Sequence, residues 1–144
     1  MPSKNFEQVV HFIERRDSDG NIIHFPIVEV TLITSTNAQT ILPLLFDTGA
    51  SFTTLSHHLY PLLGLNSWDQ GQRVHVDAVG GRPEVYQYIA TFEIFGKTIN
   101  CPIHLAKLNP HPLFQGLLGR DTIFDEFGFG FWESTRELYV TTNP

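Results

Sequence analysis

The chain has 144 residues and a formal net charge of −6, and 42% of its residues are hydrophobic while only 17% are charged. This length and composition exclude a multidomain protein and a disordered one, and they predict a single domain with a substantial core. The acidic balance removes the electrostatic attraction that nucleic acid or an anionic membrane surface requires, so we expect neither as a partner.

The first half of the chain is typical of β-structure. Strands are predicted over residues 9–14 and 22–34, which are rich in Val, Ile and Phe and flank the turn sequence 17–21. An apolar strand over residues 40–46, expected to be buried on both faces, runs directly into Asp47. The chain therefore begins with a hairpin and then presents a polar turn at the end of a buried strand.

The middle of the chain predicts short elements and a long hairpin. Residues 52–55 favour a short strand, and Ser56 is placed to cap a brief helix that Gly64 ends. Residues 72–78 and 84–95 alternate apolar and polar side chains, which indicates a two-faced hairpin around a glycine tip.

The last part returns to strands, with one helix. Strands are predicted over residues 98–106 and 115–118, and apolar spacing indicates a helix over residues 120–127. A terminal hairpin is predicted from residues 128–132 and 137–141.

Three motifs occur in a fixed order along these elements. The first is Asp47-Thr48-Gly49-Ala50-Ser51 at the end of an apolar strand, and the second is Ala78-Val79-Gly80-Gly81 at the tip of the hairpin. The third is Leu117-Leu118-Gly119-Arg120-Asp121, where a buried strand reaches a glycine and a predicted helix start. Asp-Thr-Gly alone is a common turn sequence, but the order of all three motifs is specific.

In this order the motifs resemble those of the retropepsin-like aspartic peptidases, single-domain relatives of the retroviral proteases. The resemblance spans residues 27–127 and implies an all-β fold: a closed or partly open β-barrel with one short C-terminal helix, active as a symmetric homodimer. We expect residues 1–144 to form one such domain, with the N-terminal and C-terminal hairpins as extensions of that core.

The resemblance also implies roles for individual residues. Asp47 would be the catalytic aspartate, supported in its loop by Thr48, Gly49 and Ala50, and the substrate-binding flap would contain Ala78, Val79, Gly80 and Gly81. Leu118, Gly119 and Arg120 would be structural residues near the site. Ser51 stands where retroviral relatives usually have an acidic residue, so the pairing of that residue with the arginine would be missing or replaced here.

The chemistry of amide hydrolysis explains why one aspartate is not enough. A water nucleophile needs a base and the departing group needs an acid, and two adjacent carboxylates that share one proton supply both. The chain has one Asp-Thr-Gly and no room for a second lobe, so the second Asp47 must come from another copy. The expected activity is that of an aspartic endopeptidase that cleaves extended polypeptide.

Two alternatives stay open at this point. The fold could serve as a catalytically silent dimerisation or peptide-binding module, or the chain could be a small β-barrel that binds a ligand and has no dimer. We expect no cofactor and no metal, because the seven histidines lack metal-ligand spacing and are better explained as surface or groove residues.

The cysteine content bears on the compartment. Cys101 is the single cysteine, so it cannot form an intrachain disulfide, and it is expected to be a small core side chain. Residues 1–20 contain no apolar stretch long enough for a signal peptide, and no run of about 18 apolar residues occurs. We therefore expect a reducing, cytoplasmic location.

Overall fold

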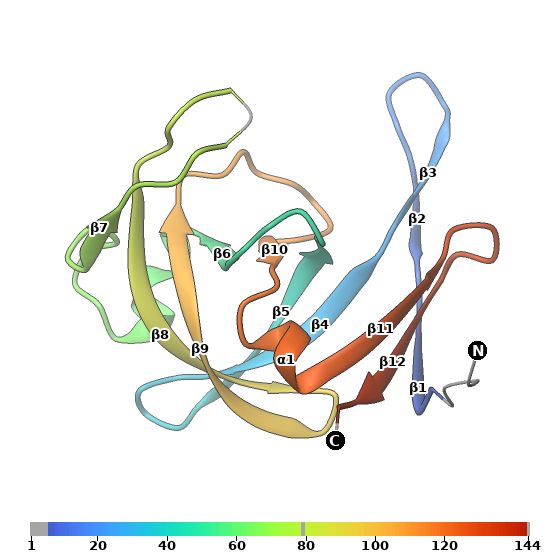
Figure 1. Cartoon of the computed structure of the whole chain (residues 1–144). Coiled ribbons are helices and arrows are strands. Elements are labelled where there is room, and N and C mark those ends of the chain that lie inside the picture. The colour runs from blue at the N-terminus through green and yellow to red at the C-terminus, as the bar shows by residue number, and fades with distance from the viewer. Residues whose placement is uncertain (1–5, 79, 144) are drawn as a thin grey trace.

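The computed structural model describes residues 6–78 and 80–143, and most of these residues lie in β-strands (Figure 1). Six strands close into a barrel, each hydrogen-bonded to the next. In barrel order they are β4 (Ile27–Ile33), β5 (Gln39–Phe46), β10 (Gly116–Leu118), β6 (Thr53–Ser56), β9 (Lys97–Ala106) and β8 (Val85–Ile94), which returns to β4. A seventh strand, β7 (Gln72–Val74), pairs with the N-terminal residues 85–87 of β8. The predicted all-β barrel is confirmed.

Strand β10 determines what lies at the centre of the molecule. It runs parallel to β5, with Leu118 opposite Phe46, and antiparallel to β6, with Leu117 opposite Thr54. Because β5 and β10 are parallel, the residues that follow them leave the barrel at the same end. Asp47 and Gly119 are therefore brought side by side although 71 residues separate them.

Alternating side chains fill the barrel. The largest fully buried ones include Phe92, Leu32, Leu42, Leu44, Ile103, Leu105 and Leu118. Burial of β5 on both faces was predicted and is wrong, because Leu42 and Leu44 are buried while Ile41 is 63% exposed. The strand has one inward face and one solvent face over its first half, as expected where no second layer covers the sheet.

The predicted N-terminal strands are each divided in two. The strand predicted over residues 9–14 is divided between β1 (Gln8–His11) and β2 (Ile13–Arg16), and between them the Phe12 amide donates to the Arg136 carbonyl. Pro26 lacks an amide hydrogen and separates β3 (Ile22–Phe25) from β4. Strands β2 and β3 form the predicted hairpin, which Figure 1 shows extending away from the barrel.

The C-terminal hairpin is confirmed and gains a third strand. β11 (Phe127–Trp132) pairs with β12 (Glu137–Thr142), and β1 pairs with the other edge of β12. The first and last parts of the described chain are thus joined in one three-stranded sheet beside the barrel.

Both helices are shorter or tighter than predicted. Residues 57–63 form a 3-10 helix, which ends at Gly64 with a left-handed φ of 72°, but Ser56 makes no side-chain capping bond. The helix predicted over residues 120–127 is only α1 (Ile123–Glu126). It starts late because Thr122, with a φ of 66°, is outside the helical conformation, and it ends early because Phe127 enters β11.

Across residues 6–78 and 80–143, neither helix has the length and apolar character that crossing a membrane requires.

Cys101 is fully buried in the barrel core, as expected. Burial and, to a smaller extent, the nearby Asp121 carboxylate together raise the pKa of its thiol to about 11. We expect iodoacetamide at pH 8 to alkylate the folded protein about 100-fold more slowly than the urea-unfolded chain, because the folded thiol forms that much less thiolate. The folded-state rate should rise with pH up to about 11. Equal rates for the folded and unfolded chains at pH 8 would contradict this burial.

Candidate active site

The loop after β5 holds the Asp47 side chain in one orientation. The Gly49 amide donates a 2.9 Å hydrogen bond to Asp47 Oδ1, and the Ala50 amide approaches the Asp47 carbonyl at 3.3 Å. A Cβ at position 49 would lie 3.2 Å from the same carboxylate oxygen, so a glycine lets the backbone approach closely. Asp47 is half-buried, whereas Thr48 and Gly49 are exposed.

The segment after β10 supports this loop through its backbone. The Asp47 amide donates to the Leu118 carbonyl at 3.1 Å. The amides of Arg120 and Asp121 donate to the carbonyls of Ala50 and Ser51 at 2.9 and 2.8 Å. The two motifs that lie far apart in sequence are therefore joined by main-chain hydrogen bonds over the whole loop.

Gly119 lies at the closest point of this contact. A Cβ there would be 2.3 Å from the carbonyl carbon and oxygen of Phe52, so no other residue fits without movement of the backbone. Its amide donates a 3.1 Å hydrogen bond to Oγ1 of Thr53, which is fully buried. Thr53 was not predicted as a site residue; a hydroxyl within the predicted short strand of residues 52–55 was the available signal.

The side chain of Arg120 reaches the other end of the loop. Its Nη2 donates to Ser51 Oγ at 3.3 Å, and both residues are exposed. A hydrogen bond from the charged guanidinium to an uncharged hydroxyl thus stands where the resemblance to retroviral relatives implied a missing or replaced ion pair.

The hairpin tip predicted as a flap forms a tight turn. Ala78 and Gly81 exchange two backbone hydrogen bonds of 3.1 Å, and Gly80 and Gly81 have φ values of 97° and 133°, which side chains disfavour. Val79 lies outside the described residues.

A strand over residues 72–78 was predicted and is wrong in extent. The regular pairing of β7 with β8 ends at Val74, and Pro83 cannot donate a hydrogen bond to continue it.

A groove of about 540 Å³ lies between the Asp47 loop and the base of this hairpin. Asp47, Gly49, Ala50 and Ala78 line it, while Thr48, Gly80 and Gly81 do not. Leu118 and Gly119 lie behind the loop and support it through the backbone. The other lining residues are Ser51, Phe52, Thr54, Val76, Asp77, Pro83, Val85, His104, Ala106, Lys107, Leu108 and Leu117.

Most of these additional lining residues were not predicted. Thr54, His104 and Leu117 come from three neighbouring barrel strands, and their place in the groove depends on strand register. His104 is 4% exposed, and burial lowers the pKa of its imidazole while the Asp121 carboxylate acts in the opposite direction. Only the alternation of residues 103–106 could have indicated that His104 faces away from the core.

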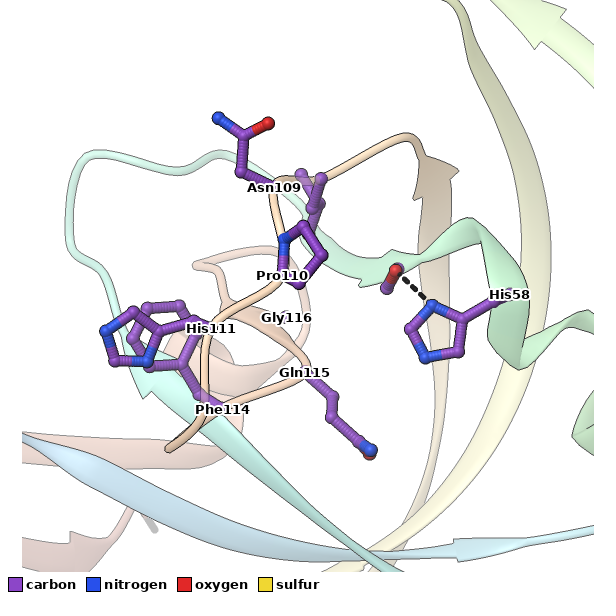
Figure 2. Close-up of a pocket in the computed structure, with 9 residues that line it drawn as sticks. His58, Asn109, Pro110, His111, Phe114, Gln115 and Gly116 are labelled. Carbon is purple, nitrogen blue, oxygen red and sulfur yellow. Dashed lines mark hydrogen bonds between the residues drawn. The ribbon is translucent and has the colours of Figure 1, made fainter.

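A smaller cavity of about 220 Å³ lies beneath the loop that connects β9 to β10 (Figure 2). In it Ser56 Oγ and His58 Nδ1 are 2.7 Å apart, and the ring of His111 stacks on Phe114 with centroids 4.0 Å apart. None of the described residues that line it carries a carboxylate. The groove at Asp47 is therefore the better candidate for acid-base chemistry.

The profile of one protein family, described as aspartyl protease, matches residues 30–122. This range includes all three motifs. The chain belongs to the aspartyl protease family. Among solved structures, it is similar to EIAV protease complexed with the inhibitor HBY-793, at 25% identity and a TM-score of 0.53, covering 70% of this chain and 86% of that one. It is also similar in fold to a retropepsin-like aspartic protease from Rickettsia conorii, at 19% identity and a TM-score of 0.55, covering 92% and 99%. Curated proteins give no match. These findings confirm the resemblance to retropepsins.

The hydrogen bond from the Gly119 amide to Thr53 Oγ1 gives a prediction about the stability of the Asp47 loop. Thr53→Val keeps the side-chain shape but leaves the buried Gly119 amide without its acceptor. We expect the free energy of unfolding to fall by about 1–3 kcal/mol in urea denaturation. Thr53→Ser keeps the hydroxyl and is the matched control, with a loss of about 1 kcal/mol for the methyl group. If Val were tolerated better than Ser, the hydrogen bond would not be what holds the loop.

Proposed function

We propose that this chain is an aspartic endopeptidase whose active form is a homodimer with one Asp47 from each copy. The observation that carries the proposal is the Asp47 carboxylate, oriented by the Gly49 amide at the wall of a groove of about 540 Å³. Membership of the aspartyl protease family supports the same chemistry.

The second carboxylate is proposed to come from a two-fold related copy. The groove of one chain contains a second acidic residue, Asp77, but it lies on the hairpin side and pairs with Arg82 at 3.1 Å. Thr48 and Gly49 are exposed in the single chain, so they are free to meet the same residues of a second copy. The Thr48 hydroxyl would then bond to the backbone of the partner loop and hold the two turns together.

The proposed reaction uses the two Asp47 side chains as base and acid. The ionised carboxylate takes a proton from water while the resulting hydroxide attacks the peptide carbonyl carbon, and the protonated one donates to the carbonyl oxygen. The carboxyl group that took the proton from water then passes it to the nitrogen as the carbon–nitrogen bond breaks, and a hydroxyl of the tetrahedral intermediate gives its proton to the other carboxylate. The products are a carboxylic acid and an amine, and the pair returns to its shared-proton state.

The substrate is proposed to be an extended polypeptide held beneath the hairpin of residues 75–84. Such a chain offers backbone hydrogen bonds at every residue, and its side chains would contact the apolar lining, which includes Val76, Val85 and Leu117. The turn closed by Ala78 and Gly81 would serve as the flap that excludes bulk water.

A catalytically silent dimerisation or peptide-binding module is the alternative. It would keep the fold without using the carboxylate, and an intact Asp47 with its Gly49 donor favours catalysis over it. Cytoplasmic location stays a prediction from the single cysteine, which is buried as a free thiol.

Replacing Asp47 by Asn tests the chemistry. The substitution keeps the size of the side chain but removes the shared proton, so we expect cleavage of an unfolded protein at about pH 5 to 6 to fall by about 10³-fold or more. Asp125→Asn, at an exposed helix position, is the matched control and should cleave at the wild-type rate. Cleavage that persists unchanged in Asp47→Asn would show that the assignment is wrong, and a wild-type protein that binds a statine-type inhibitor without cleaving would favour the silent module.

Dilution tests the requirement for two chains. If only the dimer is active, the cleavage rate should fall with the square of chain concentration below the dimer dissociation constant, and sedimentation should show the same transition from dimer to monomer. A rate that stays proportional to chain concentration while the sedimenting species is a monomer would exclude a shared dyad.

A further inference from the structure

His104 is a buried histidine that the proposed chemistry does not use. It lies on β9, is 4% exposed and lines the same groove as Asp47. On either side of it in sequence, Ile103 and Leu105 belong to the barrel core. Because side chains alternate along a strand, His104 and Ala106 face the opposite side, which is the side of the groove.

Strand register places His104 in a row across the groove floor. Leu117 on β10 is opposite Thr54 on β6, and Thr54 is opposite His104 on β9. All three line the groove. A substrate side chain that enters beside Asp47 would therefore meet an aliphatic group first, then a hydroxyl and then an imidazole.

One atom of His104 has no hydrogen-bond partner. Its Nε2 is buried and unpaired within residues 6–78 and 80–143, and the ring is covered by Phe52, with centroids 4.3 Å apart and planes 25° apart. A buried polar atom without a partner lowers stability, so an uncharged hydrophobic residue would be better here if the position served only the fold. Phe52 is half-buried and also lines the groove, so its movement would open the imidazole to a ligand.

Charges of both signs line the groove, so the lining as a whole favours neither sign of charge on a ligand. Asp47 and Asp77 repel an acidic side chain, and Lys107 opposes the attraction that these carboxylates exert on a basic one. Asp121 is the charged group that acts directly on His104, and burial outweighs it in lowering the imidazole pKa. A neutral imidazole has one donor nitrogen and one acceptor nitrogen, so its best partner is a neutral group that can both donate and accept.

We propose that His104 is a specificity-determining residue and that the subsite it forms with Thr54 and Leu117 takes an Asn or Gln side chain of the substrate. A carboxamide carries a donor and an acceptor, so it pairs with Nε2 in either tautomer of the ring. Its aliphatic stem would pack on Leu117, and Phe52 would turn aside to admit it. This inference rests on the proposed peptidase function and adds the class of side chain that the site prefers.

The test compares peptides that differ only by Asn or Leu, which are close in size, at one position at a time within three residues of the cleaved bond. At one of these positions we expect wild-type kcat/KM to be about tenfold higher for Asn. His104→Leu should reverse that preference, and His104→Gln, which keeps hydrogen-bonding groups, should retain it. His58→Leu is the matched control, because His58 lines the separate cavity of Figure 2 and its loss should not alter the preference.

A binding measurement makes the result independent of turnover. In the wild-type protein, the ¹⁵N resonance of His104 Nε2 should shift on binding a statine-type peptide with Asn at the preferred position, and not with Leu. This measurement and His104→Gln decide the matter if His104→Leu does not fold.

The outcomes separate the two proposals. Cleavage with no preference for Asn at any position, or a preference that His104→Leu leaves unchanged, overturns the role of His104 and leaves the peptidase intact. Failure of the wild-type dimer to cleave any peptide overturns the proposed function, and the subsite inference with it.

Discussion

The parallel pairing of β5 with β10 is the interaction on which the candidate site depends. It brings the ends of two strands to one place, so the Asp47 amide can donate to the Leu118 carbonyl and the following amides can support the loop. The carboxylate itself accepts a hydrogen bond from the Gly49 amide. In the proposed dimer, where each Asp47 would meet its copy, a fixed backbone is needed because small displacements at a reacting centre cost much of the rate.

Glycine and threonine make this close contact possible. Gly119 allows the backbone to approach Phe52, and Thr53 supplies the acceptor that a buried amide requires. On the outer edge of the loop, the Arg120 guanidinium donates a hydrogen bond to the Ser51 hydroxyl, and both residues are exposed. Such a contact contributes little to stability, so the loop is held mainly by its backbone and its buried hydroxyl.

The groove combines apolar walls with few polar groups, which is the usual composition of a ligand site. The Asp47 loop forms one side and the base of the residue 75–84 hairpin forms the other. His104 differs from its neighbours, because it is buried, stacked under Phe52 and unpaired at Nε2. Polar groups of this kind limit the stability of a fold, and the proposed recognition role of His104 accounts for one beside the Asp47 carboxylate.

The sequence by itself determined the local chemistry: the apolar strand before Asp47, the turn at Gly49, the glycine tip and the buried strand before Gly119. These follow from residue periodicity and turn preference, which act over a few neighbours. Only the tertiary structure decided that Thr53 supports Gly119, that the amides of Arg120 and Asp121 bond to the Asp47 loop, and that Leu117, Thr54 and His104 form one row. The physical reason is that register between strands distant in sequence is set by the closed barrel as a whole, and no short segment contains that information.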